Sequence, residues 1–191
     1  MVKGLIIPAD SGRPVESREF TGLDDYQKGV GGWIEAVDIP SLGITVYVNE
    51  EGIMLNLPFN SRATFMWWYE WPLARQKAML LGDAVVVGLP DRNGASTDVP
   101  RRTQRLLQTP TPYAVVIEVQ GKPHHARHPF PYDDYFEAVV WAMILVEQLA
   151  GNESVKVVAL ERVLMDEAGD WSFVDDSPPD ERDTPATEDQ K

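Results

Sequence analysis

The prolines between residues 90 and 112 constrain this chain more than any other feature. A turn-forming run, Pro90-Asp91-Arg92-Asn93-Gly94, opens the segment, and three further prolines interrupt the rest of it: Pro100, Pro110 and Pro112. Proline removes a backbone donor and fixes φ, so no long helix or central strand can cross such a segment. We therefore expect an N-terminal module at 1–90, a linker at 91–110 with two helical turns at most, and a C-terminal module at 111–174.

The N-terminal module is predicted to be a small mixture of strands and helices. Its strand candidates alternate with period two or are β-branched and apolar: 2–7, 33–39, 44–48 and 84–87. A further short strand is expected at Ile53–Leu57. Asn60 is a good N-cap for a helix that Pro72 ends.

The C-terminal module has the pattern of a strand, a helix and two more strands. Tyr113–Val119 is β-branched, Asp134-x-x-Glu137 fits a capping box, and nine consecutive apolar residues from Ala138 predict a helix at 134–150 that is covered on most sides. Strands are expected at 155–160 and 171–174. The predicted fold class is α+β, with two small mixed or antiparallel sheets, few helices and one buried helix.

Residues 175–191 are expected to form a disordered acidic tail. Seven acidic residues stand against two basic ones, a net charge of −5, and almost nothing apolar follows Val174. Such a segment cannot bury enough surface to offset its ordering entropy. The formal net charge of the whole chain is −13, which leaves −8 for residues 1–174.

Composition excludes several classes of function. Because the chain has 30 acidic against 17 basic residues, we expect no direct binding to nucleic acid through a general electrostatic surface. The absence of cysteine excludes disulfides, a cysteine nucleophile and thiolate metal sites. No apolar stretch reaches the length that spans a bilayer, and the first residues lack a secretion signal. We expect a cytoplasmic protein that does not bind a membrane and needs no cofactor.

The densest group of large side chains lies between residues 65 and 71. Six of seven positions are large and apolar or aromatic: Phe65, Met66, Trp67, Trp68, Tyr69 and Trp71. Together they present roughly 1,000 Å² that must be covered. The aromatic side chains would point around most of a helix, so one module cannot bury them all. We expect them to form an interface with another molecule, which is a partner or a second subunit, or else an internal seam with the C-terminal module. The dimer is the favoured state.

A second group is a candidate small-ligand site. Asn60 and Arg62 stand at a predicted helix N-terminus and could hold a phosphate or a nucleotide, together with Asn49 and Glu50 in a predicted turn. The simpler interpretation is that Asn60 only caps the helix, and this is the one we favour.

Catalytic and metal chemistry have little support. All three histidines lie in one segment, His124, His125 and His128, where Pro123, Pro129 and Pro131 prevent a helix from fixing their spacing. We therefore predict no metal site there. Glu35, Glu50 and Glu51 lack a histidine or nucleophile beside them in the sequence, so solvated turn residues are expected and no enzyme is predicted.

Arg101, Arg102 and Arg105 form the basic cluster of the chain. Three charges give weak, salt-sensitive contact with phosphate at best. Pairing with the protein's own acidic residues is the expected use.

Four short motifs occur in series in the N-terminal module. They are Gly31-Gly32-Trp33-Ile34-Glu35-Ala36-Val37, then 48–52, then Leu57-Pro58-Phe59-Asn60 with Arg62-Ala63-Thr64, and finally 82–88. In order and spacing the module resembles a family of small proteins of unknown function from actinobacteriophages, plasmids and other mobile elements. Phe59 departs from the proline found in many members. The resemblance implies a phage or mobile-element origin and carries no catalytic residues.

The predicted function is that of a non-enzymatic accessory protein of a phage or mobile element, which binds a host or phage protein and takes part in host takeover or anti-defence. Phe65, Trp67, Trp68, Tyr69 and Trp71 are the predicted interface. Two alternatives remain open: an acidic DNA mimic that inhibits a restriction enzyme, and a protein that sequesters a nucleotide.

Overall fold

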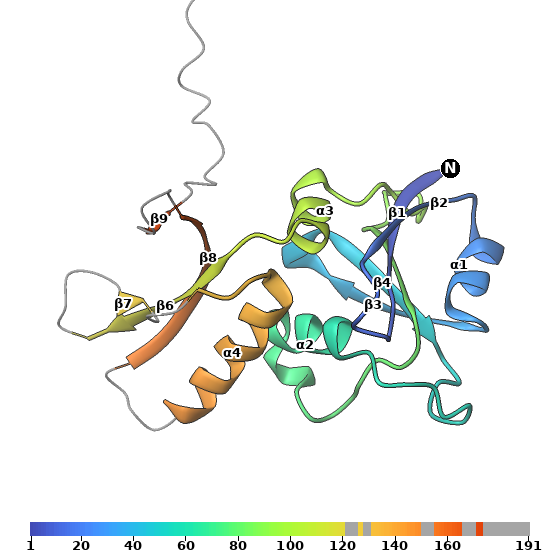
Figure 1. Ribbon diagram of the computed structural model, residues 1–191. Helices are drawn as coiled ribbons and strands as arrows, with labels where there is room; N and C mark the ends of the chain where they lie inside the picture. Colours follow the sequence, from blue (N-terminus) through green and yellow to red (C-terminus); the bar gives the residue numbers. More distant parts are fainter. Residues whose placement is uncertain (121–125, 128–130, 150–154, 166–170, 174–191) are drawn as a thin grey trace, which may run out of the picture.

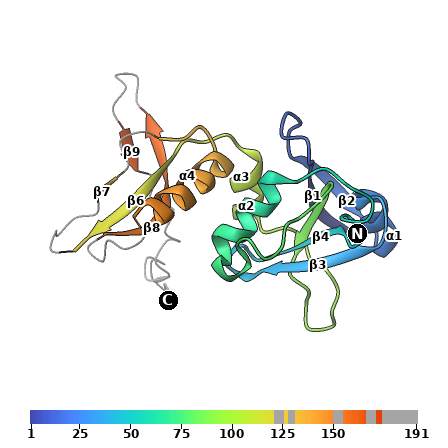
Figure 2. The same cartoon turned by 90° about the horizontal axis from the view of Figure 1, so that it is seen from below.

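The computed structural model describes residues 1–120, 126–127, 131–149, 155–165 and 171–173. Two antiparallel sheets lie at opposite ends of the molecule (Figures 1 and 2). Three helices lie between them: α2 (Ser61–Glu70), α3 (Arg101–Gln108) and α4 (Tyr135–Gln148). This confirms the predicted α+β class. The acidic tail and the three histidines lie outside the described residues.

The N-terminal sheet has five strands in the order β2-β1-β5-β4-β3. Their bounds are Glu16–Phe20 for β2, Val2–Ile7 for β1, Ala84–Gly88 for β5, Ile44–Asn49 for β4 and Ile34–Ile39 for β3. All pairs are antiparallel, and β1, β5 and β4 form the centre. Of these strands only β2 had no counterpart in the sequence prediction.

The central strands of this sheet are buried on both faces. Ile6, Val85 and Val87 point to one face, where α1 (Leu23–Val30) covers them. Gly29 lets α1 lie close, because a Cβ atom there would come within 2.4 Å of the Val85 side chain. The alternate residues, such as Val86, point to the other face and its larger core.

The second sheet has the order β7-β6-β8-β9. Its strands are β7 (Ala126–Arg127), β6 (Tyr113–Val119), β8 (Val155–Met165) and β9 (Trp171–Phe173). β6 and β8 form the long central pair, with an irregularity between Val116 and Ile117. The helix α4 (Tyr135–Gln148) packs against this sheet on one side and α2 (Ser61–Glu70) on the other (Figure 1).

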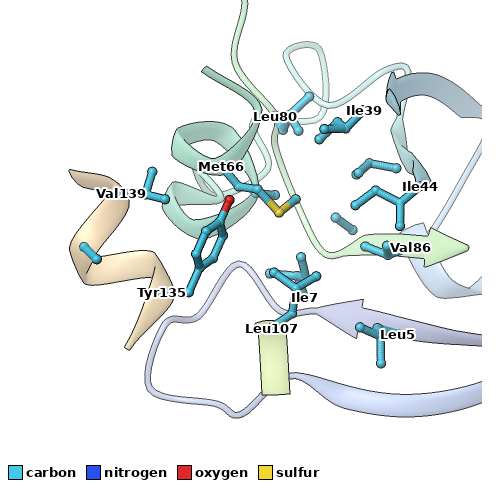
Figure 3. Close-up of a cluster of buried hydrophobic side chains, with 14 of the residues drawn as sticks. Leu5, Ile7, Ile39, Ile44, Met66, Leu80, Val86, Leu107, Tyr135 and Val139 are labelled. Atoms are coloured by element: carbon cyan, nitrogen blue, oxygen red, sulfur yellow. The ribbon is translucent and has the colours of Figure 1, made fainter. Parts of the chain in front are cut away.

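One hydrophobic core joins the two sheets through these helices. Ile7 of the first sheet, Met66 of α2 and Val139 of α4 belong to the same buried cluster, in which Tyr135 also lies (Figure 3). The burial of α4 is concentrated on the face that meets this core. Trp141, which stacks on Tyr132, and Val146, near the end of the helix, are exposed.

Both predicted helix caps are confirmed. The Asn60 side chain accepts a hydrogen bond of 3.0 Å from the Ala63 amide at the start of α2. At the start of α4, Asp134 accepts one of 2.9 Å from the Glu137 amide. A capping side chain satisfies an amide that the first helical turn leaves without an intrahelical acceptor.

The segment 91–110 contains the helix α3 (Arg101–Gln108), the predicted two turns. Val99 and Leu107 are buried in the shared core. The Thr103 hydroxyl donates a hydrogen bond of 2.6 Å to the carbonyl of Leu42, which ends the short 3₁₀ helix at Pro40–Leu42. This segment therefore packs on the first sheet while it leads to the second.

The strand expected at Ile53–Leu57 is wrong. The chain turns on itself there, with hydrogen bonds from the Leu55 amide to Glu51, from the Asn56 amide to Ile53 and from the Leu57 amide to Gly52. Asn56 has a φ of 51°, in the left-handed region that asparagine tolerates. The alternating apolar residues thus belong to a turn. Across the described residues, no helix is long and apolar enough to cross a membrane.

Candidate interaction surface

The aromatic run lies mainly on α2, and most of it packs inside the molecule. Met66 is fully buried, and Phe65, Trp67, Trp68 and Tyr69 are half-buried against the core that α4 completes. Beyond the helix end, Trp71 remains 50% exposed. The seam with the C-terminal part of the chain, one of the two predicted arrangements, therefore accounts for much of this surface.

Polar contacts reinforce the seam between α2 and the second sheet. Glu70 accepts a hydrogen bond of 3.0 Å from the Tyr135 hydroxyl and one of 2.6 Å from the Ser41 hydroxyl. The Tyr69 hydroxyl lies near the backbone of Leu160 in β8. Burial raises the pKa of Tyr69 to about 12 and that of the fully buried Tyr135 well above its ordinary value. Both hydroxyls are therefore held in their neutral form.

Asn60 uses its side chain for the fold. Its amide nitrogen donates two hydrogen bonds of 2.9 Å, to the carbonyls of Ile7 and Gly82, while its oxygen caps α2. The side chain is fully buried. It thus ties the end of β1 and the approach to β5 to the start of α2, and the favoured interpretation as a cap is the one that the structure shows.

Asn49 and Glu50 lie at the end of β4 and in the turn after it. The Asn49 side chain contacts the carbonyl of Val30 at 3.4 Å and accepts a hydrogen bond of 2.9 Å from the Glu51 amide. Asn49 is buried, whereas Glu50 is exposed. The amide of Asn49 is therefore engaged by backbone groups, like that of Asn60.

Arg62 connects three segments. Its guanidinium donates hydrogen bonds of 2.9 and 3.1 Å to the carbonyls of Pro8 and Asp10 and lies 5.8 Å from the ring centre of Phe136 in α4. Burial lowers its pKa from the ordinary value, and its Nε atom is buried without a hydrogen-bond partner. The sequence alone does not predict this role of Arg62, because its partners are more than fifty residues away in the chain.

A different set of apolar side chains is exposed beside α2. We call it the apolar surface, and it consists of Ile53, Met54, Leu55, Phe59 and Met79. Ile53 and Met54 are the most exposed of these, at 82% and 83%. Apolar patches larger than a few hundred Å² are unusual on a soluble protein and mark sites of interaction.

The backbone segments that carry the apolar surface are held together at Leu81. Phe59 pairs with Leu81 in an isolated antiparallel bridge, in which residues 59, 81 and 79 share one side of the ribbon. The chain at Gly52 also approaches Leu81, since a Cβ atom at Gly52 would lie 3.0 Å from the Leu81 Cβ atom. The turn and the bridge therefore lie side by side.

Two aromatic residues of α2, Phe65 and Trp68, extend from Phe59 of this surface toward the core. The rings of Phe59 and Phe65 are 5.8 Å apart, and those of Phe65 and Trp68 are 5.7 Å apart, both edge to face. The Trp68 indole donates a hydrogen bond of 2.8 Å to the carbonyl of Ala78. The sequence contains one signal for this surface, namely the apolar residues that lie between Gly52 and Asn56, two residue types that favour turns.

The arrangement offers contact area and no reacting groups. Among the described residues, no group of three or more histidine or acidic side chains could hold a metal ion. Such a surface can bind another apolar surface.

The comparisons with known proteins gave one match. The curated proteins and the solved structures yielded none. A family model, the domain of unknown function DUF3846, matches residues 2–110. The matched part includes the five-stranded sheet, α2, the apolar surface and α3, and it ends just before β6. Because the match covers more than half of the chain, this protein belongs to the DUF3846 family.

Proposed function

We propose that this protein acts by binding a protein partner through the apolar surface, without catalysis. The observation that carries the proposal is the exposure of Ile53, Met54 and Leu55 next to Phe59 and Met79. Interfaces are built around a small number of large apolar anchors, with methionine and aromatic residues enriched. Trp71, which belongs to the predicted interface and is half exposed, would extend the contact.

The proposed setting is the cytoplasm of a bacterial host, and the proposed partner is a host or phage protein. The support is the resemblance of the N-terminal motifs to proteins of actinobacteriophages and other mobile elements, in which an accessory role in host takeover or anti-defence is expected. The nucleotide-binding alternative has less support, because the Asn49 and Asn60 amides are engaged by the backbone. The DNA-mimic alternative also has less support, because a net charge of −8 over residues 1–174 is small for a mimic of DNA.

A matched pair of substitutions tests the proposed function. Leu55 on the apolar surface and Leu23 on α1 are 53% and 54% exposed. Leu55→Ser and Leu23→Ser therefore remove the same side chain at equal exposure. We expect affinity purification from an actinobacterial lysate, quantified by mass spectrometry, to lose its specific partner with Leu55→Ser and to keep it with Leu23→Ser. Equal recovery by both variants would contradict the proposal.

The homodimer is a separate proposal. The aromatic run is the reason to expect it from the sequence, but α4 covers much of that run within one chain. The exposed part that remains for a second subunit is Trp71 with the apolar surface. Light scattering at micromolar concentration decides the matter, since a mass of about 21 kDa rejects the dimer.

A further inference from the structure

The exposed face of α3 carries three arginines that have no acidic partner among the described residues. Arg101, Arg102 and Arg105 are all exposed, and within the described part of the chain none of them makes an ion pair. The expected pairing with the protein's own acidic residues is therefore not made by the described ones. In a chain with a net charge of −13, this leaves a concentrated positive site.

The position of these arginines is unfavourable for an isolated helix. Arg101 and Arg102 occupy the first turn of α3, where the helix dipole disfavours positive charge. Arg101 and Arg105 are also four residues apart, so their like charges face each other. A negatively charged group on this face would relieve both interactions.

Two of the three arginines line a depression in the surface. Arg101 and Arg105 line an open depression together with Gln104, Gln108 and Thr109. The two glutamines are held by hydrogen bonds: Gln108 donates one of 3.1 Å to the Val15 carbonyl, and Gln104 donates one of 3.0 Å to Gln108. The floor of the depression is therefore fixed, and its charged side is open to solvent.

The sequence supplies an acidic segment that starts nearby. Phe173, the last residue of β9, pairs with Val163, whose amide donates a hydrogen bond of 2.9 Å to the Pro112 carbonyl. Two strand spacings, about 10 Å, thus separate Phe173 from Pro112. Since α3 ends four residues before Pro112, its arginines lie within about 40 Å of Phe173 along this path.

We propose that the acidic segment 175–189 of this same chain binds the arginine face of α3. The eighteen residues after Phe173 can span up to about 60 Å when extended, so their reach is sufficient. Seven acidic residues against Arg182 give the segment the complementary charge. Tethering gives an effective concentration of about millimolar, which compensates for the weakness of individual exposed ion pairs. The segment covers the arginine face against other acidic chains.

The test uses the full chain with a nitroxide label at residue 186. Because the sequence has no cysteine, Ala186→Cys gives a single attachment site. Paramagnetic broadening of backbone amide signals is then measured by NMR at ionic strengths of about 0.01 M and about 1 M, where the Debye length is about 30 Å and about 3 Å. We expect the amides of Thr103 to Leu107 to lose most of their intensity at low salt and to recover it at high salt.

Matched variants separate the proposed contact from a general charge effect. Replacement of Arg101, Arg102 and Arg105 by Gln should abolish the broadening. Replacement of the exposed Lys28, Lys77 and Arg92 by Gln changes the net charge equally and should preserve it. The amide spectrum of the core shows that each variant is folded.

Two outcomes would overturn the proposal. One is that the amide signals of α3 are not broadened at low salt, or are broadened equally when the three arginines are replaced. The other comes from mixing isotope-labelled chains without nitroxide with unlabelled chains that carry it. If the broadening in this mixture equals that in a chain that carries both the isotope label and the nitroxide, the segment that binds α3 belongs to a second copy of the protein.

Discussion

The aromatic run on α2 and the neighbouring apolar surface differ in how far they are buried, and the difference is the reverse of what their sequences suggest. The run has the larger side chains and the denser pattern, yet Met66 is buried and the aromatic residues from Phe65 to Tyr69 pack against the core. The apolar surface has smaller, more scattered side chains, and Ile53 and Met54 are almost fully exposed.

The difference arises from the elements that each segment can pack against. α2 is a regular helix of ten residues, so α4 can lie along it and cover several side chains at once. The turn at 53–57 satisfies its backbone locally and lies at the margin of the sheet, where no other described element covers it. The dense run of aromatic residues therefore forms a stabilising seam here, and the proposed interaction surface is the exposed set of apolar residues beside it.

The largest expected effect is on the seam. Met66→Ala removes a fully buried side chain from the core that joins both sheets. We expect the free energy of unfolding to fall by about 4 kcal/mol, as for other buried methionine truncations. Chemical denaturation measures this loss. A change below about 1 kcal/mol would show that α2 is not part of the core.

Alkaline pH should weaken the seam as well. The pKa of Tyr69 is about 12 in the folded chain against an ordinary value of 10.0, so the unfolded form loses the proton first. Stability from this group is complete below about pH 10 and is lost as the pH rises to about 12, by up to about 3 kcal/mol.

Denaturation curves at several pH values should show this decline, and Tyr69→Phe should reduce it. An identical decline in Tyr69→Phe would assign the effect to other groups.

Two tryptophans of the run should differ from each other. Trp68 packs on Phe65 and donates a hydrogen bond to Ala78, whereas Trp71 is half exposed beyond the helix end. We expect Trp68→Ala to lower the free energy of unfolding by about 2.5 kcal/mol and Trp71→Ala by less than about 1 kcal/mol. Thermal unfolding of the two variants compares them directly. Equal losses would remove the distinction between seam and surface.

The hydrogen bond between the helices should contribute less. Tyr135→Phe deletes only the hydroxyl that donates to Glu70. Because the acceptor is a carboxylate, we expect a loss of about 2 kcal/mol in the free energy of unfolding. Glu70→Gln is the companion variant, since it keeps an acceptor for Tyr135 and should cost less. The reverse order would contradict this contact.

The smallest effect on stability is expected at the apolar surface. Leu55→Ser and Leu23→Ser each remove a half-exposed side chain. Both should change the free energy of unfolding by no more than about 0.5 kcal/mol. A large loss with Leu55→Ser alone would place this residue in the core and weaken its use as a probe of binding.

Local patterns were sufficient to predict most of the fold. Period-two and β-branched runs predicted β1, β3, β4, β5, β6 and β8, and both helix caps were predicted from Asn60 and Asp134. β2 was missed because Glu16–Phe20 is polar except for Phe20, as an edge strand with one buried residue can be. The turn at 53–57 has the sequence pattern of a strand, because Ile53, Leu55 and Leu57 alternate as strand residues do.

The contacts that join α2 to the rest of the molecule are long-range, and a single sequence does not contain them. Arg62 binds carbonyls near residue 9, and Glu70 joins Ser41 to Tyr135. Nothing local in these residues specifies such partners. The choice between an interface and an internal seam for the aromatic run likewise depended on the placement of α4, whose Tyr135 lies sixty-five residues beyond Glu70 in the chain.

Photo-cross-linking in host cells tests the central claim most directly. A photoreactive residue at position 55 probes the apolar surface, and the same residue at position 23 probes an equally exposed site on α1. We predict that position 55 forms a covalent product with one defined protein and that position 23 does not. The same products at both positions, or none at position 55, would contradict the assignment of this surface as the binding site.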